Sequence, residues 1–352
     1  MSEQRRDARA NRQLMSEQET DAALESRVTT TLRSEMTELS GTTDVGPLER
    51  LAGGHSGLTY RIRAGDAVLV VKAVPPGQRP IGRHDMLRQA RILKALAGTG
   101  MPVPAVRAVD DTSPAWFAMD LVPGEALEPV LDDPPIEPLL AAARMRHAAA
   151  ILPRLHAVPL ADLPVDGEPL SPAAELARWV RTMAAVPAEL VPRSADLQRA
   201  LEVSIPDPVP PALVHGDYRL GNLIVAGYHP KALIDWEIWA PGDPRVELGW
   251  FLVFADGDNF PGVGRSIPGL PGEDELVEAY RDGSGGRAQV ENLAWFNALG
   301  RFKMAAIMGH NLRRHREGRH HDPAQEKLPL TIVQLLESGL DRLARPGPEG
   351  RS

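Results

Sequence analysis

The segment 213–235 constrains the fold of this chain more than any other part of its sequence. An apolar pair leads into His-Gly-Asp, and Asn222 follows Asp217 by five residues, directly before an apolar run. A turn of Gly, Tyr, His and Pro then leads to a second apolar run, which ends on Asp235. Two such runs joined by a short turn predict a β-hairpin. This hairpin would bring Asn222 and Asp235 together on one rim, with Asp217 in the loop just before it.

The residue types at these positions suit the transfer of a phosphoryl group. Asn and Asp side chains supply the hard oxygen ligands that Mg²⁺ prefers. Phosphoryl transfer also requires a carboxylate close to the attacking hydroxyl group. A lone His-Gly-Asp could be a capped loop, and a lone Asn before a strand is usually a turn residue. Because all of these features occur together, the segment predicts a functional site.

Composition narrows the possible functional classes. The chain has 352 residues and a formal net charge of −8, which argues against general nucleic-acid binding, since that requires a basic surface. The absence of Cys excludes disulfides, thiolate nucleophiles and Cys-ligated zinc. No apolar run is long enough to span a membrane, and the polar N-terminus has no signal-peptide pattern. We therefore expect a cytoplasmic protein with no nucleic-acid or membrane partner, in an oligomeric state that the sequence leaves open.

The two ends of the chain have compositions that do not favour a stable fold on their own. Residues 1–45 are rich in Ser, Thr, Glu, Gln and Arg, so we expect a polar extension that is partly disordered or helical. The string Met-Ser-Glu-Gln at Met1 recurs at Met15, which fits a choice between two start codons better than a repeat. Residues 346–352 are rich in Pro and Gly and are expected to form a disordered tail.

Between these ends the sequence changes once, from short β-type runs to mainly helical segments. Residues 46–122 contain short β-type runs, such as 59–62 and 67–72, and one helical segment at 82–97. Residues 123–345 are mainly helical, with Pro between the segments. We therefore predict an α+β protein, in which a small antiparallel sheet with one packed helix precedes a larger, mainly helical part. Helices are expected at 137–157, within 171–202, and at 273–283, 287–316 and 325–345.

The segment around Asp217 resembles the aminoglycoside phosphotransferase and choline kinase family, which is related to the protein kinases. Protein kinases carry His-Arg-Asp with an Asn five residues after the Asp, and here Gly216 stands in place of that Arg. The resemblance implies that Asp217 is the catalytic residue that accepts or orients the proton of the substrate hydroxyl group. It also implies that Asn222 and Asp235 bind the magnesium ions.

The same resemblance implies a two-lobed kinase-like fold, with ATP or GTP bound between the small β lobe, residues 46–122, and the larger helical lobe. The expected reaction is Mg²⁺-dependent transfer of the γ-phosphoryl group to a hydroxyl group of a small molecule. Because backbone groups would recognise the base, the sequence does not distinguish ATP from GTP. The resemblance gives structural roles to His156, His215 and Asp243, the last as a helix cap.

Nucleotide contacts in the small lobe are expected at two places. A Gly-rich turn contains Gly53, Gly54 and Ser56, and its backbone N–H groups could hold phosphate oxygens, although such a turn is most often a plain hairpin. Lys72 ends an apolar run, and in kinase-like folds a strand lysine contacts the nucleotide phosphates. Taken alone, Lys72 would be a solvated strand end.

Two further small-lobe features follow from the resemblance. Gln89 lies on the apolar face of the predicted helix, where the family commonly has a Glu that pairs with the strand lysine. Gln89 can form a hydrogen bond with Lys72 but not an ion pair. The run 116–124 resembles the family hinge, which places Met119 and Leu121 near the nucleotide base. The side chain of Met119 fits the core better than a contact with the base.

The substrate and two competing functions stay open. A basic cluster at 313–321 fits either an exposed helix C-terminus or a pocket for an anionic substrate. The Gly-rich turn and the segment 102–104 resemble a family branch related to the kinase-like domains of some acyl-CoA dehydrogenases, which would suggest a hydroxyacyl-CoA rather than an antibiotic.

Gln89 favours a pseudokinase that binds nucleotide and signals by contact. The histidines of the basic cluster would permit a metallohydrolase, although no acidic partner spacing supports a zinc site.

Overall fold

The computed structural model describes residues 21–35, 37, 44–51, 57–75, 77–319 and 321–344. This part of the chain forms two compact units. The first unit contains the described residues up to Ala97, together with Val103–Val122 and Trp236–Ile238. The second unit contains Gly98–Pro102, Pro123–Asp235 and the described residues from Trp239 onward. Several predictions fall outside the described residues, namely those on Gly53, Gly54, Ser56, His320 and the tail at 346–352.

The first unit is built on a five-stranded antiparallel sheet in the order β1-β2-β3-β5-β4. Its strands are β1 (Glu49–Arg50), β2 (Leu58–Ala64), β3 (Ala67–Ala73), β4 (Val106–Asp110) and β5 (Trp116–Asp120). Gly65 lies in the tight turn between β2 and β3, with a φ of 59° that glycine adopts without strain. The predicted antiparallel sheet is therefore confirmed.

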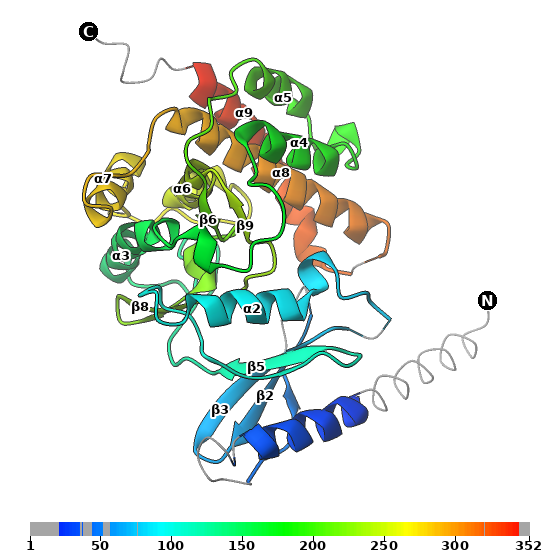
Figure 1. Cartoon of the computed structure of the whole chain (residues 1–352). Helices are drawn as coiled ribbons and strands as arrows, with labels where there is room; N and C mark the ends of the chain where they lie inside the picture. Colours follow the sequence, from blue (N-terminus) through cyan, green and yellow to red (C-terminus); the bar gives the residue numbers. More distant parts are fainter. Residues whose placement is uncertain are drawn as a thin grey trace, which may run out of the picture. The chain divides into compact units, whose positions relative to one another are not determined.

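Helices pack on both sides of this sheet. The helix at 21–35 buries three apolar side chains against β2 and β3, namely Leu24, Val28 and Leu32. α2 (Met86–Leu96) follows the short 3-10 helix η1 (Gly82–His84) and packs on β4 and β5, on the other side of the sheet in Figure 1. Val71 of β3 belongs to the same hydrophobic cluster as the three side chains of the first helix. Because successive side chains of a strand point to opposite faces, the neighbouring Lys72 points to the other face of the sheet. The second half of the predicted polar extension is thus part of the first unit.

The second unit is mainly helical. Its α-helices are α3 (Pro138–His156), α4 (Pro172–Met183), α5 (Ser194–Glu202), α6 (Pro244–Leu252), α7 (Glu273–Gly283), α8 (Leu293–Arg316) and α9 (Leu328–Ala344). Its 3-10 helices are η2 (Leu160–Asp162), η3 (Ala188–Leu190), η4 (Leu220–Asn222), η5 (Val253–Ala255), η6 (Gly257–Asn259) and η7 (Pro323–Lys327). Two short antiparallel strand pairs complete it: β6 (Ala212–Val214) with β9 (Ala240–Gly242), and β7 (Leu223–Ala226) with β8 (His229–Leu233).

Capping side chains define where α4 and α6 begin. Ser171 accepts a hydrogen bond from the backbone N–H of Ala174, and Asp243 accepts one from the backbone N–H of Arg245. In both helices a Pro follows the cap at the first helical position, where its missing N–H has no cost. The predicted capping role of Asp243 is confirmed.

The long helix α8 is central to the core of the second unit. It packs along α9 and against α6, and Figure 1 shows α8 in orange beside α9 in red. Besides apolar side chains it buries Arg301 and Lys303. A buried charge is costly unless it is paired or hydrogen-bonded, so the partners of these two residues matter for the function. Among the described helices, none combines the length and apolar composition that a membrane crossing requires.

Candidate active site

Asp217 follows β6 and lies in the loop before η4, where two N–H donors hold its carboxylate. Trp250 Nε1 donates to Oδ1 at 3.1 Å, and Asn222 Nδ2 donates to Oδ2 at 2.7 Å. Arg219 Nε lies 3.5 Å from Oδ1. The Asp217 side chain keeps 27% of its surface exposed, so a ligand can still reach it. The carboxylate is therefore both oriented and accessible.

His215 determines the shape of this loop. The backbone N–H of Asp217 donates to His215 Nδ1 at 3.2 Å, so the neutral ring carries its proton on Nε2. Nε2 then donates to the carbonyl oxygen of Ile234 at 2.9 Å. Between them Gly216 has a φ of 89°, a left-handed value that favours glycine. His215 thus ties the Asp217 loop to the residue before Asp235, which confirms its predicted structural role.

The predicted hairpin is present as β7 and β8, and it brings the backbone of Asn222 beside Ile234. The N–H of Ile234 donates to the carbonyl oxygen of Asn222 at 2.9 Å. Asp235 comes next, with a φ of 67° that Asp and Asn tolerate better than most residues. Because Asn222 gives its Nδ2 to Asp217, its Oδ1 is the amide atom suited to a cation. An amide oxygen and a carboxylate are hard donors, and this set fits Mg²⁺.

Glu247 on α6 binds the backbone of the same loop. Its Oε2 accepts the N–H of His215 at 2.7 Å, and its Oε1 accepts the N–H of Gly216 at 2.8 Å. His156 Nε2 lies 3.8 Å from Oε2. Burial alone would raise the pKa of Glu247, but His156 and His215 outweigh it and hold the pKa below its ordinary value. Glu247 is therefore an ionised carboxylate that anchors the loop.

A second buried carboxylate, Glu128, contacts η4. Its Oε2 accepts the N–H of Gly221 at 3.2 Å and lies 3.9 Å from Arg219 Nη1. Burial raises the pKa of Glu128 to about 8, although the Arg219 charge and the Gly221 N–H act in the opposite direction. The Arg219 guanidinium crosses Gly221 so closely that a Cβ there would fall 1.9 Å from Nη1. Arg219 thus lies between Glu128 and Asp217.

Comparison with known proteins shows which family the chain belongs to. The model of the phosphotransferase enzyme family matches residues 47–296, which include Asp217, Asn222 and Asp235. The chain belongs to the phosphotransferase enzyme family. The resemblance seen in the sequence is therefore confirmed.

The relatives and solved structures agree with this family. Over 334 residues the chain is 29% identical to acyl-CoA dehydrogenase family member 10 of Mus musculus, covering 88% of this chain but only 30% of that protein. A crystal structure assigned as an aminoglycoside phosphotransferase of Ralstonia eutropha superposes with a TM-score of 0.73 and 22% identity, covering 90% of this chain and 98% of that one. A spectinomycin phosphotransferase solved with ADP and spectinomycin has a TM-score of 0.58 and 13% identity, covering 88% and 96%. The solved structures establish the kinase-like phosphotransferase fold.

The family's predicted nucleotide contacts lie in the first unit. Lys72 is buried on β3, and Gln89 is buried on α2. The inward direction predicted for Gln89 is thus confirmed. Met119 is buried in β5, as expected of a core residue, whereas Leu121 is 43% exposed. The roles of these four residues toward a nucleotide stay predictions.

The basic cluster at 313–321 is paired largely with neighbouring carboxylates. Arg316 forms a two-bond ion pair with Glu326, at 2.9 and 2.7 Å. Arg319 lies 3.3 Å from Glu317. These contacts fit an exposed helix end better than a pocket for an anionic substrate. Within the described residues no group of three or more His, Cys, Asp or Glu side chains could hold a metal ion, so the zinc hypothesis finds no ligand set there.

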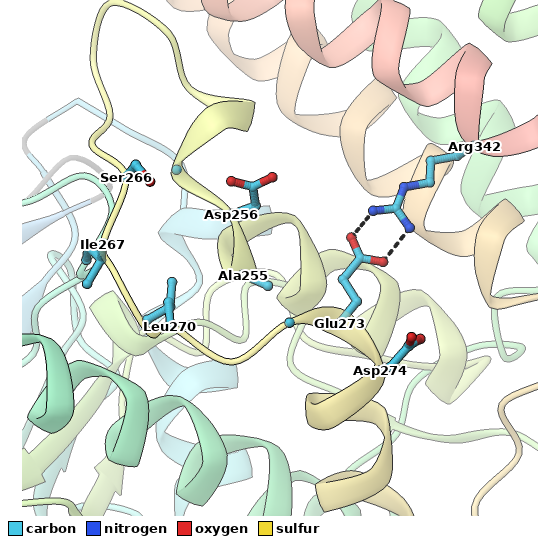
Figure 2. A pocket seen from close by; sticks show the side chains of 10 residues that line it. Ala255, Asp256, Ser266, Ile267, Leu270, Glu273, Asp274 and Arg342 are labelled. Atoms are coloured by element: carbon cyan, nitrogen blue, oxygen red, sulfur yellow. Dashed lines mark hydrogen bonds and ion pairs between the residues drawn. The ribbon is translucent and has the colours of Figure 1, made fainter.

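The second unit also contains a pocket of about 480 Å³. Figure 2 shows Glu273 reaching toward Arg342, with which it forms a two-bond ion pair, and Asp256 and Asp274 also line the pocket. None of the predicted site residues is among its lining residues. The pocket is therefore separate from the Asp217 site.

Sequence analysis missed several residues that surround Asp217. Trp250 and Glu128 are far from the motif along the chain and have no local signature. Lys303 had a signal, because it interrupts the apolar run 302–307 on a predicted helix. A charge inside such a run indicates a buried group with a specific partner.

Proposed function

We propose that this chain is a Mg²⁺-dependent small-molecule kinase that transfers the γ-phosphoryl group of ATP or GTP to a hydroxyl group. The observation that carries the proposal is the hydrogen bond between Asn222 and Asp217, together with the backbone bond that places Asn222 beside the residue before Asp235. These two contacts bring together the backbone segments that carry Asp217, Asn222 and Asp235, which supports a site built from two carboxylates and an amide oxygen.

Asp217 would orient the attacking hydroxyl group and receive its proton. Each of its carboxylate oxygens takes one N–H donor, so the direction of the free lone pairs is set before a substrate arrives. Such preorganisation lowers the barrier, because little reorganisation remains for the reaction itself.

Asn222 Oδ1 and the Asp235 carboxylate would hold Mg²⁺. When bound, the ion would neutralise charge on the nucleotide phosphates. His215 and Glu247 would keep the loop and the hairpin in register, because both bind backbone atoms of these segments. This role would not require either side chain to touch the substrate.

The nucleotide would be held by residues of the first unit. Lys72 would contact its phosphates, with Gln89 as a neutral partner of the lysine. The solved structure of a family member with ADP supports a nucleotide co-substrate. The remaining proposed contacts are the backbone of Gly53, Gly54 and Ser56 at the phosphates, and Met119 and Leu121 near the base.

The acceptor would be a hydroxylated small molecule, and two classes have support. The curated relative named as an acyl-CoA dehydrogenase family member favours a hydroxyacyl-CoA, whereas the spectinomycin phosphotransferase favours an antibiotic-like polyol. The chain spans 30% of the length of that relative, so the relative's name covers much that this chain does not contain.

The test is transfer of labelled γ-phosphate from ATP or GTP to a panel of hydroxylated acceptors, including hydroxyacyl-CoAs and aminoglycosides. We expect Mg²⁺-dependent transfer to at least one acceptor and its loss in Asp217→Asn. Asp282→Asn, an exposed carboxylate change on α7, should keep wild-type activity. Transfer that survives Asp217→Asn would overturn the assignment.

The pseudokinase is the alternative that one residue favours. Gln89 cannot form the ion pair that a Glu would give Lys72, and this could leave a protein that binds nucleotide without turnover. Gln89→Glu separates the two: a kinase weakened at this position gains activity, whereas a binding module does not. Nucleotide binding without transfer in both forms would favour the module.

A further inference from the structure

Lys303 on α8 is a buried lysine next to the candidate active site. Only 3% of its surface is exposed, and its ammonium group donates a hydrogen bond to the carbonyl oxygen of Gly216. Its Nζ also lies 3.8 Å from the ring centroid of Trp250 and 5.2 Å from that of Trp179. One charged group thereby connects α4, α6 and α8 to the loop that carries Asp217.

The charges around Lys303 come from three of these segments. Asp217 in the loop, Glu247 on α6 and Glu175 on α4 attract the ammonium group, and Arg178 on α4 repels it. In the described part of the chain no carboxylate forms a direct ion pair with Lys303. A lysine that only filled space would be better replaced by an apolar residue, because burying a charge is costly even where a carbonyl oxygen and two ring faces hold it. The position therefore indicates a role in the site.

We propose that Lys303 is a positioning residue for Asp217, acting through two contacts at once. Its hydrogen bond fixes the carbonyl of Gly216, directly before Asp217. Its positive charge lies over the ring of Trp250, whose indole N–H binds the Asp217 carboxylate. The proposal rests on the proposed function, in which Asp217 receives the hydroxyl proton.

The contact with Trp250 has a direct electrostatic consequence. A cation over the face of an indole ring is attracted by the ring's negative face. It also draws electron density toward itself, which makes the indole N–H a stronger donor. Since that N–H is the donor to Oδ1 of Asp217, loss of the charge should loosen the carboxylate. Lys303 would thus act without touching a substrate.

This arrangement makes the site sensitive to alkaline pH. Burial lowers the pKa of Lys303 to about 8, although Asp217, Glu175 and Glu247 favour the charged form. Lys303 is therefore charged at pH 7 and loses its proton as the pH rises through about 8. Phosphoryl transfer should then decline over the same interval.

The first test is optical and needs no substrate. Trp250 and Trp179 flank the ammonium group, so tryptophan emission of the full chain should change between pH 6 and 10 with a midpoint near 8. Because burial raises the pKa of Glu128 to about 8 as well, all titrations use the Glu128→Gln background. There the change should be absent in Lys303→Met and present in Lys327→Met, which removes an exposed lysine from η7. The same titration in Lys303→Met as in the wild type would overturn the proposal.

The second test is kinetic and uses the acceptor found in the transfer screen. At pH 7 we expect kcat of Lys303→Met to fall at least about tenfold, with little change in the KM for nucleotide. With Glu128→Gln also in place, Lys303→Arg should restore part of kcat and should lack the decline near pH 8, because Arg keeps its charge throughout. Unchanged kcat and an unchanged pH profile in Lys303→Met would contradict the positioning role.

The two proposals fail in different ways. If the proposed function is wrong, the wild-type chain transfers no phosphate to any acceptor. If only the role of Lys303 is wrong, the wild type is active and Lys303→Met keeps the same alkaline decline. A folded Lys303→Met variant, judged by a cooperative thermal transition, is required for either comparison.

Discussion

Trp250 on α6 donates its indole N–H to Oδ1 of Asp217 at 3.1 Å, although 33 positions separate the two residues in the sequence. Four residues into the same helix, Glu247 accepts the backbone N–H groups of His215 and Gly216. One helix, started by its Asp243 cap, therefore orients both the carboxylate and the backbone of its loop. The proposed catalytic geometry depends on α6 as much as on the loop itself.

Replacing Trp250 with Phe tests this relationship. The ring remains, but the N–H donor to a charged acceptor is lost, which costs about 1.5–3 kcal/mol. If the lost hydrogen bond stabilises the transition state, kcat drops about 10- to 150-fold while the KM for nucleotide changes little. Steady-state kinetics at pH 7 measure both values.

Trp295→Phe is the matched control for this variant. Trp295 is also buried and donates its indole N–H to the carbonyl oxygen of Leu201, away from Asp217. It should lose similar stability and keep its kcat. Equal losses of kcat in the two variants would mean that general destabilisation, not the Asp217 contact, explains the effect.

Glu247→Gln should loosen the loop and reveal a pH-dependent contribution to stability. Gln can accept only one of the two N–H bonds, so the free energy of unfolding at pH 7 should fall by about 1–3 kcal/mol. The pKa of Glu247 lies below its ordinary value of 4.5, so the stabilisation is fully present above pH 4.5 and lost as the pH falls through the folded-state pKa. Urea denaturation at several pH values measures the difference between the two proteins.

Glu202→Gln, at an exposed position of α5, is the control for this series. It should show no such difference at pH 7. A gap between wild type and Glu247→Gln that stays constant down to the lowest accessible pH would argue against an ionised Glu247.

The parts of the site that were predictable are those whose partners are close in sequence. Asn222 and the residues leading to Asp235 belong to one hairpin, and its two apolar runs joined by a short turn are a local signal. The helix at 273–283 was predicted with the bounds of α7, because apolar residues recur there at helical spacing. The strand β4 was missed, since its five residues include Arg107 and Asp110 and give no apolar run.

The parts that were not predictable depend on contacts between distant segments. Glu128 lies close to Arg219 and accepts a hydrogen bond from the N–H of Gly221, which is 93 positions away in the sequence. No local sequence pattern predicts a contact between residues so far apart. Leu24, Val28 and Leu32 show the opposite difficulty: their spacing is helical, but three apolar residues within a polar segment were too few to predict packing on the sheet.

Gly221→Ala should displace the Arg219 side chain. A Cβ at 221 would fall 1.9 Å from Arg219 Nη1, and the flexible guanidinium must move away from it. Because Arg219 Nε lies 3.5 Å from Asp217, we expect kcat to fall about 3- to 30-fold with little loss of stability. Kinetics and thermal melting of the purified variant separate the two effects.

Gly272→Ala provides the comparison, because nothing lies within 4 Å of the added Cβ there. Its kcat should match that of the wild type. If Gly221→Ala is equally active, Arg219 has no influence on the reaction.

Glu128→Gln should gain stability relative to the wild type as the pH rises. The folded-state pKa of Glu128 is about 8 against an ordinary value of 4.5, so between these values the folded protein holds a proton that the unfolded chain releases. Wild-type stability therefore falls with rising pH across this interval, by up to about 5 kcal/mol in total at about 1.4 kcal/mol per pKa unit, whereas Gln has no proton to lose. Chemical denaturation at pH 5 and pH 8 measures the change in the difference between the two proteins.

Glu168→Gln, at an exposed position, should show the same difference from wild type at both pH values. If Glu128→Gln behaves like this control, Glu128 is already ionised at pH 5, and Arg219 is held by a full ion pair instead of a protonated carboxyl group.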